Sequence, residues 1–257
     1  MARSHSFVPG HVIGYALATQ LGRSKGGKPE DFQTALREVS ASARFAPAFI
    51  LDRQGRIEQD WPDHPERYLS GDHHVTLHLE KRSAVEGALF EVEYLAPRRL
   101  HGSGKGQPIR LGGGLWLRDS KLAGRSWREW LDFCRLGGEL KAGYGIVRCI
   151  DWQENAATFH GWGRSQPDGL HLSDKDSRLW GPARDCVMGV DDAPLIPWTG
   201  RRYDFSQGTG GFGQRLETVT LVKLNAKITQ PLTLMPSGQE VSHLGCWESS
   251  EGFTYFT

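Results

Sequence analysis

The sequence predicts an α+β fold, because some segments have the apolar spacing of helices and others that of strands. Residues 10–21 and 29–43 repeat apolar side chains every three or four positions, which is the spacing of one helix face. Residues 74–80 and 89–95 instead alternate apolar and polar side chains, as half-buried strands do. Beyond residue 152, turn-forming residues separate short apolar runs, which favours further β-structure.

Both early helices have recognisable ends. The first is expected to follow Pro9, since proline suits the first helical turn, and to end at Gly22. The second is expected to start at Pro29 and to end before Pro47, because proline biases the residue before it toward extended structure. The basic segment between them, residues 23–28, is expected to be a solvated linker.

The two alternating segments predict a β-hairpin whose turn comprises residues 83–87. The polar residues 52–72 before it are expected to form an exposed loop. After it, residues 98–106 are basic and glycine-rich, so they either contact phosphates or form a mobile surface loop. Residues 109–117 are expected to form a further strand, interrupted by three glycines.

The stretch 125–152 combines a capped helix, a glycine-rich loop and an apolar segment. Ser126 and Glu129 have the S-x-x-E spacing of a capping box, which satisfies free amides at a helix start. Four residues then form an apolar helical stripe: Trp127, Trp130, Leu131 and Cys134. The loop at 137–145 contains four glycines, and residues 146–150 are expected to form a buried strand.

A loop with so many glycines lets backbone amides approach a ligand, and nearby cations favour a phosphate. The candidate residues in and beside the loop are Gly137, Gly138, Lys141, Gly143, Tyr144, Gly145 and Arg148. Further basic candidates are Arg98, Arg99, Arg118, Lys121 and Arg125. The alternative interpretation is a tight helix-to-strand turn that binds nothing, beside a merely solvated basic face.

Composition excludes several classes of protein. The 257 residues include 31 Lys and Arg against 30 Asp and Glu, so an RNA-binding function must depend on local basic patches. No apolar run is long enough to cross a membrane, and the first ten residues lack an apolar signal core, so a cytoplasmic location is expected. The four cysteines are scattered without a C-x-x-C pair, which predicts buried thiols, no metal site and no cofactor.

The order of helix, glycine loop and apolar segment resembles the closing unit of the RAMP superfamily (repeat-associated mysterious proteins). Members of this superfamily build CRISPR RNA-guided effector complexes, and their loop has the form G-x-x-x-x-G-[FY]-G. Four residues match it: Gly138, Gly143, Tyr144 and Gly145. The segment Val8-Pro9-Gly10 resembles the RAMP first-helix motif, and residues 74–95 resemble the central hairpin of the smaller RAMP subunits of type III-D complexes.

The resemblance implies a ferredoxin-like (RRM-like) RAMP domain over residues 1–152, with its glycine-rich loop at 137–145. Residues 153–257 would then be a β-rich extension or a degraded second ferredoxin-like unit. The implied function is that of a non-catalytic, RNA-binding subunit of a CRISPR-Cas effector ribonucleoprotein of type III, which serves antiviral defence. The implied partners are crRNA, whose backbone the loop would hold, and other effector subunits, with target nucleic acid contacted indirectly.

The sequence departs from the family in two places. Only residues 1–8 precede the Pro-Gly motif, so the opening strand of a ferredoxin-like domain is expected to be short, degenerate or supplied by a neighbouring chain. RNA-cutting RAMP subunits have an aspartate near an R-F-x-x-A segment. The segment Arg44-Phe45-Ala46-Pro47-Ala48 has none, which implies that cleavage has been lost.

Two alternative functions stay open. The first is a metal-independent crRNA-processing endoribonuclease of the same superfamily, with His11 or His160 as weak candidates for acid-base catalysis. Such nucleases have the glycine loop close to the carboxyl terminus, whereas residues 146–257 follow it here. The second alternative is a β-rich enzyme with a small-molecule pocket among the carboxyl-terminal glycines and tryptophans.

Overall fold

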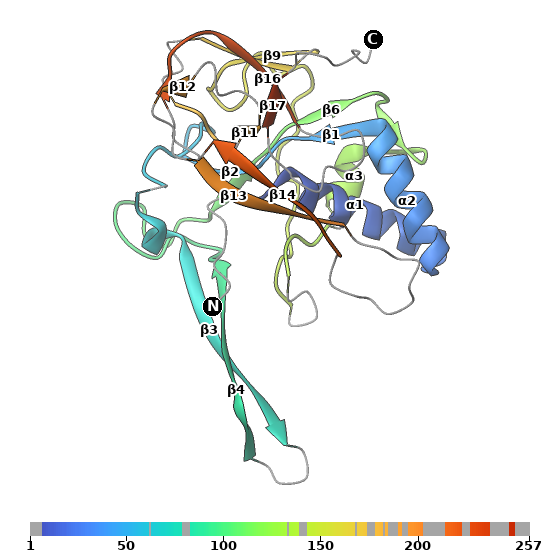
Figure 1. Cartoon of the computed structure of the whole chain (residues 1–257), viewed down its shortest axis with the longest axis vertical. Coiled ribbons are helices and arrows are strands. Elements are labelled where there is room, and N and C mark those ends of the chain that lie inside the picture. The colour runs from blue at the N-terminus through green and yellow to red at the C-terminus, as the bar shows by residue number, and fades with distance from the viewer. Residues whose placement is uncertain are drawn as a thin grey trace. The chain divides into compact units, whose positions relative to one another are not determined.

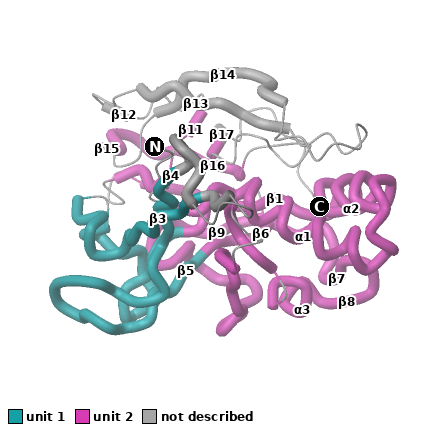
Figure 2. Tube along the Cα trace, turned by 90° about the horizontal axis from the view of Figure 1, so that it is seen from below, with its two compact units in different colours: residues 1–6, 49–112 teal, residues 7–48, 113–257 magenta. Residues whose placement is uncertain are grey.

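A computed structural model confirms the α+β class, with helices and small, mainly antiparallel sheets. The structure describes residues 7–61, 63–78, 83–132, 134–138, 143–167, 169–173, 178–181, 183–184, 190–191, 195–202, 214–222, 227–236 and 247–249. The chain forms two compact units (Figure 2). Unit 1 comprises Met1–Ser6 with Phe49–Gly112, and unit 2 comprises Phe7–Ala48 with Gly113–Thr257. These units do not follow the boundary after residue 152, which stays a prediction from the sequence.

Two packed helices open unit 2: α1 (Gly10–Lys25) and α2 (Pro29–Ser42) (Figure 1). The prediction that the first helix ends at Gly22 is wrong, because α1 continues to Lys25 and is capped by Gly26, whose φ of 142° favours glycine. Gly22 instead permits close packing, since a Cβ atom there would lie 2.5 Å from the Phe32 ring. The start of α2 at Pro29 is confirmed.

The helices pack against a short pair of strands in the same unit. Strand β1 (Ala43–Phe45) pairs antiparallel with β6 (Leu115–Leu117), and Val8 forms an isolated bridge with Ala48. At the start of α1, a Cβ atom on Gly10 would lie 2.0 Å from the carbonyl oxygen of Phe45. The first helix can therefore approach the strand only because residue 10 is glycine.

A small hairpin leads to the third helix. It comprises β7 (Lys121–Leu122) and β8 (Arg125–Ser126), and α3 (Trp127–Leu131) follows directly. Helices α1, α2 and α3 share one hydrophobic core, whose fully buried members are Leu17, Leu21, Ala35, Val39 and Trp127. Among the described residues that precede the glycine loop, all sheets have two strands, so the ferredoxin-like arrangement is not confirmed.

Unit 1 contains β2 (Phe49–Leu51) paired with β5 (Arg110–Gly112), the 3₁₀ helix η1 (Pro65–Arg67) and a long hairpin. The hairpin comprises β3 (Leu69–His78) and β4 (Ser83–Leu95) and is drawn in Figure 1. Its predicted turn is wrong, since Ser83 already pairs with His78 and residues 83–87 belong to β4. Both strands begin earlier than the alternating segments, because backbone pairing already starts at Leu69 in β3 and at Ser83 in β4.

The prediction of a uniformly exposed loop at residues 52–72 is also wrong. Trp61 and Tyr68 are only 1% and 0% exposed and meet edge-to-face, with ring centroids 4.9 Å apart. With Ile50 they form the core of unit 1. The burial of these two aromatic side chains could not be predicted, because most of the residues around them in the sequence are polar.

The carboxyl-terminal part of unit 2 is rich in strands. A seven-stranded sheet has the order β13-β14-β11-β17-β16-β10-β9. Its strands are β9 (Arg164–Gln166), β10 (Gly169–Leu172), β11 (Ala183–Arg184), β13 (Leu195–Arg202), β14 (Gln214–Val222), β16 (Leu232–Pro236) and β17 (Trp247–Ser249). Separately, β12 (Val190–Asp191) pairs with β15 (Lys227–Ile228). Whether this region is a degraded second ferredoxin-like unit stays a prediction.

Aromatic side chains pack together at this end of unit 2. Phe159, Trp162 and Trp116 each contact the ring of Trp247, with centroid distances of 5.6, 5.9 and 6.1 Å. The indole N–H of Trp247 donates to the carbonyl oxygen of Trp180 at 2.7 Å. In the described part of the chain, no helix is both long and apolar enough to span a membrane.

The contact between Gly10 and β1 gives a prediction about stability. Gly10→Ala should lower the free energy of unfolding by roughly 1–3 kcal/mol, because the new methyl group overlaps a backbone carbonyl that cannot move aside. Gly138→Ala is the matched control, since a Cβ atom there meets nothing within 4 Å. Chemical denaturation of the two variants measures the difference, and equal stability would contradict the packing described.

Candidate nucleic-acid interface

Two buried indole rings fix the position of α3. Trp127 and Trp130 are 1% and 5% exposed, and their Nε1–H groups donate to the carbonyl oxygens of Asp119 (2.8 Å) and Leu122 (2.9 Å). At the helix start, the Ser126 hydroxyl oxygen accepts a bond from the Glu129 amide (3.3 Å) and its hydrogen is directed to the Glu129 carboxylate (2.9 Å). The predicted cap is therefore present, although the helix is only five residues long.

The glycine loop is closed by backbone pairing at its base. The amide of Leu136 donates to the carbonyl oxygen of Gly145 at 2.8 Å, and Arg135 forms an isolated bridge with Ile146. Gly145 has a φ of 78°, and a Cβ atom there would lie 2.2 Å from the carbonyl oxygen of Leu136. Because any side chain would collide at this position, glycine is required for the loop to close.

The described backbone of the loop is open to solvent. Gly137, Gly138 and Gly143 are exposed, and Cβ atoms built on them would meet nothing within 4 Å. Lys141 lies outside the described residues. At Gly137, Gly138 and Gly143, therefore, a ligand can approach the main chain without displacing any described side chain.

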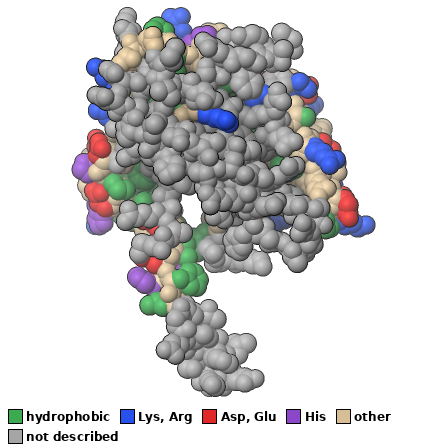
Figure 3. All heavy atoms as spheres, in the orientation of Figure 1, with side chains coloured by type: hydrophobic (Ala, Val, Ile, Leu, Met, Phe, Trp, Pro, Cys, Tyr) green, Lys and Arg blue, Asp and Glu red, His purple; other side chains and the backbone are tan. Residues whose placement is uncertain are grey.

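Exposed basic side chains lie on the segments that lead into and out of the loop: Arg118, Lys121, Arg125 and Arg148. The Arg125 guanidinium is 5.3 Å from the centre of the Trp130 ring, which is a cation–π distance. On the face drawn in Figure 3, described basic side chains are mixed with acidic ones, as the balanced net charge leads us to expect.

The two other predicted basic residues belong to unit 1. Arg98 is exposed, and its Nη1 donates to the carbonyl oxygen of Gly106 at 2.9 Å. Arg99 is 16% exposed, forms an ion pair with Glu58 and lies over the Tyr68 ring, with its guanidinium 4.9 Å from the ring centroid. Arg118, Lys121, Arg125 and Arg148 therefore belong to the same unit as the glycine loop, whereas Arg98 and Arg99 belong to unit 1.

The prediction of a buried strand at residues 146–150 is wrong. Ile146 makes a single bridge, and the residues after it have no regular ladder. Ile146 and Ile150 are 69% and 65% exposed, whereas Val147 packs against the core of unit 2. The segment is held in place by a side chain instead of a partner strand, because the Asp132 carboxylate accepts a hydrogen bond from the Cys149 amide at 2.9 Å. Neither this bond nor the two exposed isoleucines could be inferred from an apolar run.

Both histidines proposed for catalysis lie in unit 2. The His11 ring meets the Tyr15 ring edge-on at 6.2 Å, and its Nδ1 atom is buried. His160 lies with Nε2 3.2 Å from the carbonyl oxygen of Gly113. Within the described segments, no cluster of three His, Cys, Asp or Glu side chains could hold a metal ion.

The described thiols are poor nucleophiles. Burial raises the pKa of Cys134 to about 12, and its Sγ lies 3.4 Å from the carbonyl oxygen of Trp130. Burial, with a contribution from the Asp132 carboxylate, also raises the pKa of Cys149. Because the thiolate is the reactive form, neither side chain is suited to covalent catalysis.

Comparisons with known proteins show a distant structural similarity. No protein-family model matches the sequence, and no curated protein matches it either. The chain is similar to a chain in a cryo-EM structure of the type III-B Cmr-beta bound to cognate target RNA, at 12% sequence identity and a TM-score of 0.45. The match covers 88% of this chain and 77% of that chain. At this level of similarity, function must be argued from the residues of this chain.

The buried thiol beside α3 gives a prediction about pH. The pKa of Cys134 rises from 9.0 to about 12 on folding, so the unfolded chain loses this proton first as pH increases. Stability from Cys134 is therefore complete below pH 9.0 and is lost as pH rises from 9.0 toward 12, by up to about 1.4 kcal/mol per pH unit. Denaturation curves should show a steeper loss for the native chain than for Cys134→Ala, and parallel curves would contradict the burial.

Proposed function

We propose that this chain is a non-catalytic RNA-binding subunit of a CRISPR effector ribonucleoprotein of type III, in which it holds the backbone of crRNA. The proposal combines the RAMP-like sequence motifs with one structural observation. That observation is the loop at 137–145, in which Gly137, Gly138 and Gly143 are exposed with open space beside the main chain, and which follows a helix fixed by two indole rings.

The chemistry of the loop suits a polyanion without selecting a base sequence. Exposed amides at Gly137, Gly138 and Gly143 can donate to phosphate oxygens, which are accessible in any nucleotide sequence. The guanidinium of Arg148 and its basic neighbours supply the neutralising charge. Base sequence would then be read by pairing between guide and target.

The segment that resembles the cleavage region of related subunits favours a non-catalytic role. Ala46 and Ala48 are 0% and 4% exposed, so neither position offers a carboxylate or access to a substrate. Asp52 comes later in the chain and belongs to unit 1. Partial burial opposes its ionisation, but bonds from the Arg56 amide and guanidinium lower the pKa of Asp52, so that it serves as a structural anion.

A binding experiment with labelled single-stranded RNA tests the proposal. Arg148→Gln should weaken binding and make the slope of log K against log salt shallower by about 0.7, because one phosphate contact to a single strand is lost. Gly138→Ala should weaken binding without changing stability, since its methyl group occupies only the open space beside the backbone. Fluorescence anisotropy at several salt concentrations measures both effects.

Arg23→Gln is the matched control, because it removes one exposed charge from α1 rather than from the loop region. Equal weakening by Arg23→Gln and Arg148→Gln would indicate unspecific attraction and contradict a site at the loop. Metal-independent cutting of repeat RNA that disappears in His160→Ala or His11→Ala would replace the proposal with the endoribonuclease alternative. RNA binding that is absent, or insensitive to salt, would reject both.

A further inference from the structure

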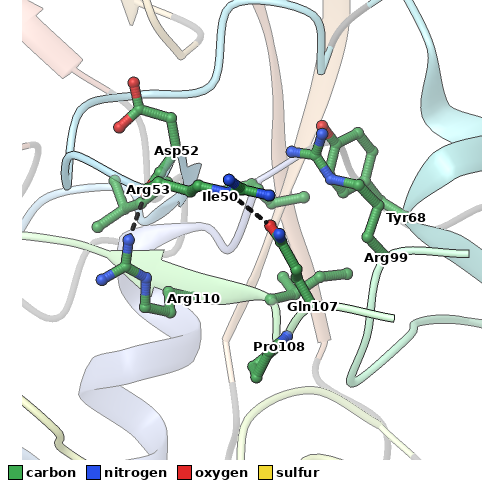
Figure 4. Close-up of a pocket in the computed structure, with 10 residues that line it drawn as sticks. Ile50, Asp52, Arg53, Tyr68, Arg99, Gln107, Pro108 and Arg110 are labelled. Carbon is green, nitrogen blue, oxygen red and sulfur yellow. Dashed lines mark hydrogen bonds between the residues drawn. The ribbon is translucent and has the colours of Figure 1, made fainter. Parts of the chain in front are cut away.

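Unit 1 contains a cavity of about 230 Å³ that the glycine loop does not share (Figure 4). Its lining comes from three segments of the unit: residues 50–53, Tyr68, and the region from Arg99 to Arg110. The volume is below the roughly 300–1,000 Å³ of pockets for drug-sized ligands, so the cavity suits a small group. The residues considered so far for RNA binding include one member of this lining, Arg99.

Three guanidinium groups line the cavity, and two of them retain unused donors. Arg53 donates from Nε to the Gln107 side-chain oxygen at 3.0 Å, and Arg110 donates from Nη2 to the carbonyl oxygen of Asp52 (Figure 4). Each guanidinium has five N–H groups. Among the described residues, no acceptor is found for the terminal nitrogens of Arg53 or for Nε and Nη1 of Arg110.

The acidic side chains nearby do not neutralise these two arginines. The Asp52 carboxylate binds Arg56 at 3.0 Å and accepts the amides of Gln54 and Arg56, and Figure 4 shows it pointing away from Arg110 and Gln107. Glu58 forms its ion pair with Arg99. Arg53 and Arg110 therefore leave an uncompensated positive charge at the cavity.

A buried hydroxyl group is a further unused donor at the same place. Tyr68 lines the cavity and is 0% exposed. Its hydroxyl makes no well-formed hydrogen bond among the described residues, and the neighbouring Glu58 carboxylate is already paired with Arg99. Burial, with a contribution from the Glu58 carboxylate, raises the pKa of Tyr68 to about 12, so the hydroxyl keeps its proton. A buried polar group without a partner is costly, which favours a bound group that accepts its hydrogen.

We propose that this cavity binds a phosphate group between Arg53 and Arg110, with the Tyr68 hydroxyl as an additional donor. Guanidinium groups bind tetrahedral phosphate through paired N–H groups, and two of them can share one dianion. Ile50 and Ile109 provide an apolar wall that lowers the local dielectric and strengthens those bonds. The phosphate can belong to a free ion, a nucleotide or an RNA backbone, and the site does not depend on the function proposed above.

Calorimetric titration of the full chain with inorganic phosphate, adenosine 5′-monophosphate and a short single-stranded RNA tests this site. Arg53→Gln and Arg110→Gln should each weaken binding by about tenfold, because a charge-assisted hydrogen bond is lost. Lys105→Gln is the matched control: it removes one exposed charge from the loop at residues 101–107 but does not line the cavity. Tyr68→Phe should weaken binding by a smaller factor without unfolding the chain.

Comparable affinity for phosphate and the nucleotide would support the site with a free ion as ligand, and tighter nucleotide binding would support a phosphomonoester. Binding of RNA alone would support a backbone phosphate, provided that each of the two arginine variants weakens it by about tenfold. The proposal is overturned if none of the three binds, or if Lys105→Gln weakens binding as much as Arg53→Gln. Gly138→Ala separates the two sites, since it should reduce RNA binding at the glycine loop and leave phosphate binding in unit 1 unchanged.

Discussion

The glycine loop depends on the two hydrogen bonds that the indole rings of α3 make with the backbone of the preceding segment. A helix of five residues is too short to be stable by itself, since helix formation is cooperative and its first turn is unfavourable. Trp127 and Trp130 compensate by burying large apolar surfaces while their N–H groups stay satisfied. With the helix held in this way, the chain can close the loop through the backbone bond between Leu136 and Gly145.

Much of this arrangement could be predicted from the sequence where local rules decide the outcome. The cap at Ser126, the start of α2 at Pro29 and the burial of Trp127, Trp130 and Cys134 each depend on residues close together in the chain. The long hairpin was predicted from its alternation, although its ladder extends beyond the alternating residues. The requirement for glycine at residue 145 was indicated by the loop pattern, and the collision with Leu136 explains it.

The rest could not be predicted because it depends on contacts between distant residues. Gly22 has the sequence signature of a helix end but serves to admit the ring of Phe32. Trp61 and Tyr68 are buried by residues from other segments of unit 1, which no local pattern reveals. The cavity beside Tyr68 combines residue 53 with residue 110, and a sequence gives no sign that their side chains converge. Ile146 and Ile150 are the opposite case: they were expected to be buried but are exposed, because an apolar run alone does not show whether a partner strand covers it.

The pairing of β2 with β5 has a consequence for how such a chain can vary. Phe49 and Gly112 are direct neighbours across that ladder, so the Phe49–Gly112 segment of unit 1 leaves and rejoins the rest of the chain at adjacent points. A segment with neighbouring ends can be lengthened, shortened or exchanged while the flanking chain needs only a tight turn to stay connected. The Phe49–Gly112 segment therefore has the connectivity of an interchangeable insert, on which new binding properties can evolve while the helices and strands of unit 2 keep their own packing.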